Sequence, residues 1–171
     1  MSETKYPIDI VCDVIQQELG LEDTQIMEYN EEFMIPTVPG IFIVASIVND
    51  KILAVENSLD ADGNEVQEVA MMSMIQIDIM SKNQEARERR IEVVAALGSM
   101  YAQEQYINNS MKVGRIPADF VDTSALEESA RMNRYTATIT VNSLYRKTKD
   151  GAYYNVIQAP AQWIETKPQE D

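Results

Sequence analysis

Few side chains in this sequence suit acid–base chemistry. It contains no histidine, the side chain whose ordinary pKa lies near neutrality, so catalysis would need carboxyl or lysine groups with strongly shifted pKa values. The acidic pairs Glu31 with Glu32 and Glu127 with Glu128 are neighbours in the chain. Because adjacent residues face apart on a helix or a strand, we expect both pairs to be solvated surface residues.

An acidic loop and a single cysteine are the other candidates for chemistry. A calcium-binding loop starting at Asp60 would need glycine at its sixth position and glutamate at its twelfth, whereas Gly63 comes fourth, so a tight turn is the better explanation. Cys12 lies on the apolar stripe of a predicted helix, which favours a small core residue over a nucleophile. No glycine-rich phosphate loop or nucleophile motif occurs. We therefore expect no catalytic, cofactor-binding or metal-binding residues, and no enzyme.

Composition narrows the class of protein further. The 171 residues, 45% of them hydrophobic, suit one domain over residues 1–171, with a core at about 7–158 and a charged tail at 159–171. One cysteine, no secretory pattern and no long apolar run predict a protein that stays in a reducing cytoplasm, away from membranes. The net charge of −14 argues against sequence-specific DNA binding. This acidity serves solubility, or it forms a surface past which nucleic acid moves without sticking.

The secondary-structure elements that would position these side chains begin with an amphipathic helix. Apolar residues recur at helical spacing over Pro7–Leu19, with Pro7 suited to the first turn and Gly20 to the C-terminal stop. Two prolines then predict an edge strand or loop over residues 33–39.

A long hairpin follows this first helix. A β-branched run over residues 40–48 predicts a strand covered on both faces, and Asn49 with Asp50 predicts a turn into a strand at residues 51–55. The polar residues 57–65 predict the hairpin tip. The returning strand, residues 65–80, alternates between two faces. One face holds Val69, Met71, Ile75, Ile77 and Ile79; the other holds Ala70, Met72, Met74, Gln76, Asp78 and Met80. This second, Met-rich face is either core covered by a helix or an adaptable protein-contact surface.

A second helix and a last long strand complete the core. Ser81 and Gln84 form the pattern of a capping box, which predicts a helix running to about Gln105. Its expected buried stripe is Ile91, Val94, Ala95, Gly98 and Ala102, flanked by Leu97 and Tyr101. Gly98 is expected to allow a close approach to the sheet. Residues 108–130 predict an irregular crossing with a short strand at 111–116, which either covers one end of the sheet or contacts a partner. Residues 131–146 alternate as a strand with one wet face.

The chain end predicts one more strand. Lys149, Asp150 and Gly151 suit a turn, after which residues 152–157 can pair back. The expected fold is therefore α+β: a mostly antiparallel, twisted β-sheet with a long β-hairpin arm, packed on one face by two main α-helices.

The order of these elements and two short motifs resemble a known family. The first motif, at Gln76, Asp78 and Ser81, ends a strand that leads straight into the packing helix. The second, at Arg134 and Tyr135, opens the last long strand. In both respects residues 7–158 resemble the tail-terminator, or neck, proteins of tailed bacteriophages.

The resemblance implies a structural virion protein without catalytic residues. It implies a hexameric ring, assembled in the host cytoplasm, that caps the tail tube, stops tube polymerisation and presents a head–tail joining surface. The implied partners are further copies of the chain, the tail tube protein (and the sheath if the tail is contractile) and the head-side connector. DNA would pass through without specific binding, and we expect more acidic than basic side chains in the channel.

The hairpin arm is the expected contact surface, since a ring needs a protruding element and a matching edge. The predicted interface residues are Ile52, Leu53, Val55, Asn57, Asp60, Asp62, Met72 and Met74. The alternatives are another head–tail connector, a tail-completion or tail-tube protein, a monomeric ligand-binding module, or an enzyme using carboxylates and a metal.

Overall fold

The first helix and its boundaries agree with the sequence. The computed structural model describes residues 5–29, 40–116, 119–124, 126–127 and 130–149. Helix α1 spans Pro7–Leu19, with Asp9 accepting a hydrogen bond from the Tyr6 backbone amide at 2.8 Å. It ends at Gly20, whose φ of 61° is left-handed and favours glycine.

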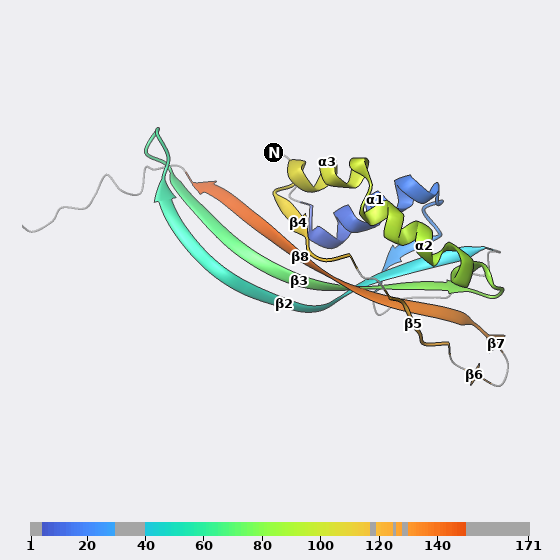
Figure 1. Ribbon diagram of the computed structural model, residues 1–171. Helices are drawn as coiled ribbons and strands as arrows, with labels where there is room; N and C mark the ends of the chain where they lie inside the picture. The colour runs from blue at the N-terminus through green and yellow to red at the C-terminus, as the bar shows by residue number, and fades with distance from the viewer. Residues whose placement is uncertain (1–4, 30–39, 117–118, 125, 128–129, 150–171) are drawn as a thin grey trace, which may run out of the picture.

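One curved sheet organises the rest of the chain (Figure 1). Its strands lie in the order β1-β2-β3-β8-β4, with β5 also pairing β8. Their bounds are β1 Ile26–Glu28, β2 Ile41–Leu59, β3 Glu65–Ser81, β4 Met111–Val113, β5 Val121–Asp122 and β8 Asn133–Lys149. The β1–β2 pair is parallel and the other pairs of this sheet are antiparallel. Strands β6 (Leu126–Glu127) and β7 (Ala130–Arg131) pair separately.

The helices cover one face of this sheet. Residues of all three helices join Ile43, Ile77 and Ile139 in a single buried cluster, so the odd-numbered face of β3 is the core face. The Met-rich face, with Met72 and Met74, points to the opposite side. At the β1 end of the sheet that opposite face carries a smaller buried cluster centred on Phe42, Val44 and Met80. The predicted α+β class with a mostly antiparallel sheet is confirmed.

The single long helix predicted after Ser81 is wrong. The structure has two helices there, α2 (Glu85–Leu97) and α3 (Met100–Asn108). Ser99 caps α3 by accepting a hydrogen bond from the Ala102 amide at 3.0 Å. A side chain at Gly98 would lie 3.2 Å from the Ile116 side chain, so the predicted close approach is real but occurs at a break between helices.

Two further details of α2 differ from expectation. Gln84, not Ser81, is the N-cap residue, although the Ser81 hydroxyl accepts a hydrogen bond from the Ala86 amide at 3.0 Å. The buried stripe is also shifted: Val93 and Leu97 are buried, whereas Ile91 is 68% exposed. The capping serine therefore lies outside the helix and holds its first turn from the end of β3.

The hairpin has no turn at Asn49 and Asp50. β2 runs without interruption from Ile41 to Leu59, and its register with β3 shifts at Val48 and Leu53. Bulges of this kind bend a strand and raise its twist while leaving it paired, which is how the polar Asn49 and Asp50 are accommodated in mid-strand. The strand is covered on both faces only as far as Ala45.

The remaining sequence expectations divide into two groups. The short strand predicted at 111–116 is β4, and the last long strand is β8 with the predicted alternation. The expectations for residues 33–39 and 152–157 fall outside the described residues. None of the helices in the described part is both long and apolar enough to cross a membrane.

Candidate subunit interface

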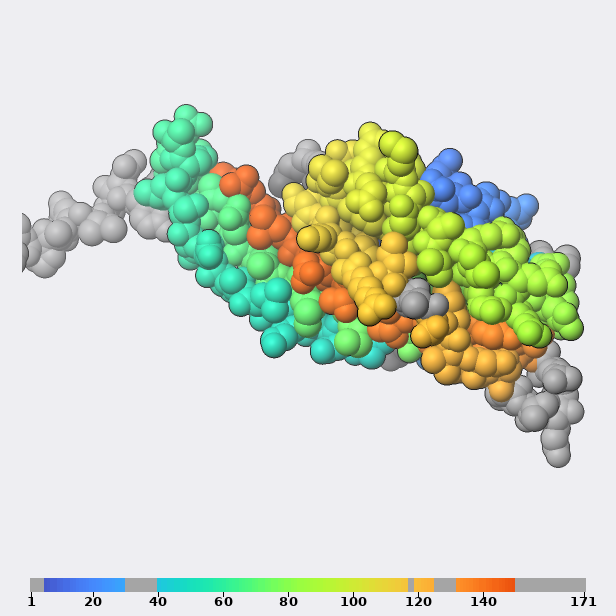
Figure 2. All heavy atoms as spheres, in the orientation of Figure 1, coloured from blue at the N-terminus to red at the C-terminus, as the bar shows by residue number. Residues whose placement is uncertain are grey.

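The sheet continues beyond the helices as a three-stranded arm. We use "arm" for residues 47–59 of β2, 65–74 of β3 and 142–149 of β8, which curve toward the helix side and project from the body (Figure 1). In Figure 2 the same strands stand clear of the helices. Many more side chains of this arm are exposed than of the strand segments beneath the helices.

Over most of the arm, both outer edges lack a neighbouring strand among the described residues. β1 pairs β2 only at Ile43–Ala45 in register, so β2 from Ser46 to Leu59 is an edge strand. On the other side, β4 and the Ser110 carbonyl bond β8 only as far as Leu144. Such edges carry backbone donors and acceptors that can pair with another chain.

Exposed apolar side chains follow the β2 edge. Ile52 is 63% exposed, Val55 62% and Leu59 64%. Single exposed apolar residues are common, whereas several together on a projecting strand make a candidate contact surface.

The predicted interface residues divide between two faces and the tip. By register with β3, Ile52, Val55 and Asn57 lie on the helix side of the arm. Met72 and Met74 lie on the opposite face and are half-buried on the middle strand. Leu53 is the extra residue of a bulge. The eight residues therefore do not form one continuous patch.

The tip is a turn that the Asp60 carboxylate organises. Its Oδ1 accepts hydrogen bonds from the Asp62 and Asn64 amides at 2.9 and 2.8 Å, and its Oδ2 accepts one from the Asn64 side chain. The hydrogen bonds from Asn64 hold the pKa of Asp60 below its ordinary value. Gly63 has a φ of 82°. The carboxylate thus acts as a turn residue, and within the described ranges no three acidic or cysteine side chains gather as metal ligands.

The two motifs behind the resemblance meet on the face opposite the helices. The Arg134 guanidinium donates to both oxygens of Asp78, at 3.1 and 2.7 Å, and Gln76 donates to the same carboxylate at 2.9 Å. Thr136 donates a fourth hydrogen bond. Burial alone raises the pKa of Asp78, but these hydrogen bonds outweigh that effect and hold the pKa below its ordinary value.

Tyr135, the other half of the second motif, faces the helices. The Arg90 guanidinium of α2 lies 5.3 Å from the centre of its ring, a cation–π contact. The Arg134–Tyr135 pair therefore fixes β8 on both faces, one residue to each side.

Cys12 remains a thiol at neutral pH. Burial, followed by the charges of Glu28, Asp13 and Asp9, raises its pKa to about 12. A thiol in this state is a poor nucleophile, which agrees with the expected packing role.

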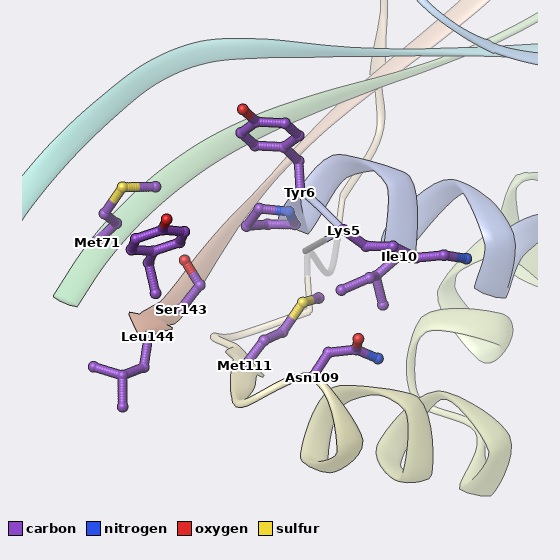
Figure 3. A pocket seen from close by; sticks show the side chains of 10 residues that line it. Lys5, Tyr6, Ile10, Met71, Asn109, Met111, Ser143 and Leu144 are labelled. Carbon is purple, nitrogen blue, oxygen red and sulfur yellow. The ribbon is translucent and has the colours of Figure 1, made fainter. Parts of the chain in front are cut away.

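Two hollows lie where the arm leaves the body. The first has a volume of about 160 Å³ and lies between the start of α1 and the sheet. Tyr6 and Ile10 come from the α1 side, Met71 and Ser143 from the sheet, and Met111 lies between them (Figure 3). Its volume is well below the roughly 300 Å³ at which ordinary ligand sites begin.

The second hollow, which we call the β4 groove, is larger and shallower, at about 320 Å³. The residues that characterise it are Leu53, Ala70, Ile107, Met111, Lys112 and Leu144. Sequence reasoning missed it, although Leu144 gave a signal as an apolar residue on the otherwise polar side of β8.

The fold and these surfaces define an α+β protein with an extended sheet arm, open strand edges among the described residues, and exposed apolar side chains. No protein-family model matches the sequence, and no curated protein matches it.

Proposed function

We propose that this chain is a structural virion protein that forms a ring on the end of a phage tail tube. The ring stops tube polymerisation and forms the surface to which the head-side connector joins. The observation that carries the proposal is the projecting arm, which combines open strand edges with exposed apolar side chains.

In a chain without a partner, the arm leaves apolar side chains in water and one edge of β2 unpaired among the described residues. Ile52, Val55 and Leu59 are more than 60% exposed, and burying each in a contact is worth on the order of 1 to 2 kcal/mol. Backbone pairing along β2 would add directional hydrogen bonds to this apolar contact. Both terms are gained only when another chain covers the arm.

The positions of the candidate contact surfaces support a ring. The arm projects from one end of the molecule, and the helices cover the body at the other (Figure 1). A contact between an arm and a different surface of the next copy is head-to-tail, and it closes into a ring when its rotation divides the circle.

Among ring-forming proteins, we favour a phage tail terminator because of the two sequence motifs that this chain shares with that family. Gln76 and Asp78 end β3, Arg134 opens β8, and the three side chains form one hydrogen-bonded network. The motifs are thus physically coupled across 56 residues of sequence, which supports reading them together.

The acidity also suits a channel for DNA. The chain has 28 acidic and 14 basic residues, and a channel with an excess of carboxylates repels phosphate and lets the genome pass. The hexameric ring would thus bind the tail tube, the sheath where there is one, and the connector, while DNA passes without specific binding.

Electron microscopy of phage tails tests the role directly. Tails assembled without this protein should have uncontrolled tube lengths, and adding the purified chain should restore one length. Normal tube lengths with heads unattached would assign the chain to another head–tail connector instead. Normal lengths with attached heads would refute both roles.

A shortened arm tests its part in the ring. Deleting residues 57–66 removes the tip and leaves the body intact, so we expect a folded chain that no longer forms rings. Rings that persist in negative-stain images of the deletion variant would show that the tip has no role in assembly.

A further inference from the structure

The β4 groove has an apolar floor that is open to solvent. Leu53, Ala70 and Leu144 come from three neighbouring strands at matching register positions, Leu53 being the bulge residue beside Ala54. Leu53 is 51% exposed and Leu144 41%, and Ile107 at the end of α3 is 75% exposed. Three exposed apolar side chains around one hollow form a surface that gains free energy when covered.

The rim of the groove carries a cation. Lys112 lines it from β4, held there by backbone pairing with Asn142. Its side chain is exposed and has no ion-pair partner among the residues that the structure describes. An apolar floor with an unpaired cation at its edge fits an apolar segment that carries a carboxylate.

The hairpin tip of this same chain has that chemistry. Leu59 is 64% exposed and is followed within three residues by Asp62, whose side chain is also exposed. The Asp60 hydrogen bonds already fix the turn, so little conformational entropy would be lost on docking.

A chain cannot fill its own groove with its own tip. The tip lies at the far end of the arm, whereas β4 lies beside the body (Figure 1). The groove and the tip are therefore separate surfaces, one at the base of the arm and one at its far end.

We propose that the hairpin tip of a second copy of this chain occupies the β4 groove, with Leu59 on the apolar floor and Asp62 facing Lys112. The contact joins two different surfaces, so it is head-to-tail and repeats from copy to copy. It rests on the ring assembly proposed above and specifies which surfaces of the two copies meet.

A charge exchange tests the polar half of the contact. We expect Asp62→Lys and Lys112→Glu each to weaken self-association of the full chain by about tenfold at low salt, measured by sedimentation. The double variant, in which the pair is reversed, should recover most of that loss. Equal weakening in the double variant would refute the pairing.

The apolar half has a matched control. Leu59→Ser should weaken self-association, whereas Ile91→Ser, at an equally exposed position (68%) on α2, should leave it unchanged. Circular dichroism verifies that both variants are folded. Equal effects of the two substitutions would overturn the docking of Leu59.

Crosslinking separates this docking from the function of the ring. In a Cys12→Ala background, copies carrying Leu59→Cys are mixed with copies carrying Ile107→Cys and treated with a short bismaleimide, both in solution and on tail tubes. A crosslink that is absent when Ile91→Cys replaces Ile107→Cys supports the docking. Controlled tube length without the crosslink refutes the docking alone, and the crosslink with uncontrolled tube length refutes tail termination alone. A chain that stays monomeric and uncrosslinked in both settings overturns the docking.

Discussion

At the scale of single residues, the most demanding environment is that of Asp78. Its side chain is 5% exposed, and Arg134, which neutralises it, is 41% exposed. A buried carboxylate that loses its partner keeps its desolvation penalty, whereas the exposed arginine is partly compensated by water.

Replacing Arg134 should therefore destabilise the fold. We expect Arg134→Ala to lower the free energy of unfolding by about 2 kcal/mol, a value reduced for the exposure of the arginine, as measured by urea denaturation. Lys147→Ala, on the same strand and exposed, serves as the control and should change it by less than about 0.5 kcal/mol. Equal effects of the two would mean that the Asp78 network contributes nothing specific.

Glu28 makes stability depend on pH in the opposite sense from Asp78. Partial burial, together with a hydrogen bond and charge repulsion from Asp9, raises the pKa of Glu28 from 4.5 to about 7. A carboxyl with a raised folded-state pKa contributes stability below pH 4.5 that is lost as pH rises through about 7. We expect the thermal midpoint to fall between pH 5 and 8 and Glu28→Gln to flatten that fall. An unchanged pH profile in the variant would refute the assignment.

Residue types alone predicted some environments and not others. Alternation along β3 separated Ile75 and Ile77 from Met72 and Met74 correctly, because side chains on a strand face opposite sides in turn. The burial of Asp78 could not be predicted, because its partner Arg134 lies 56 positions away and the β3–β8 register brings them together.

At the scale of elements, the break between α2 and α3 depends on two residues. Gly98 leaves room for the Ile116 side chain, and Ser99 caps the second helix. The sequence predicted one continuous helix across Gly98 and Ser99, because Ala102 keeps the helical spacing of the apolar residues before it. The break depends on a side chain from beyond β4, which no local pattern contains.

Removing the cap should weaken α3. We expect Ser99→Ala to lower the free energy of unfolding by about 1 kcal/mol, because the Ala102 amide loses its acceptor. Chemical denaturation provides the measurement, with Gln103→Ala at an exposed position of the same helix as the control. No difference between the variants would mean that water replaces the cap at no cost.

At the scale of the whole molecule, the arm and the body differ in how many of their backbone donors and acceptors are paired within the chain. Strand β3 is bonded on both sides, whereas β2 beyond Ala45 is bonded on one side among the described residues. The sequence predicted an arm and its tip. It did not predict that β2 runs unbroken along the arm, because the polar residues Asn49 and Asp50 suggested a turn.

Hydrogen exchange should report this difference. In the free chain, we expect amides of β2 between Ser46 and Leu59 to exchange faster than those of β3 between Ile75 and Ile79, and to become protected on assembly. Mass spectrometry of peptic fragments makes the comparison. Unchanged exchange along β2 in assembled rings would exclude strand pairing through that edge.

The two bulges of β2 affect how readily unassembled copies of the chain could aggregate edge to edge. A flat, regular edge rich in β-branched residues is a template for fibrils, in which copies of one chain stack edge to edge. The extra residues at Val48 and Leu53 break the repeat along that edge, and Lys51 lies between them. Indiscriminate stacking is therefore discouraged, while a partner whose own strand matches the irregular spacing can still bind.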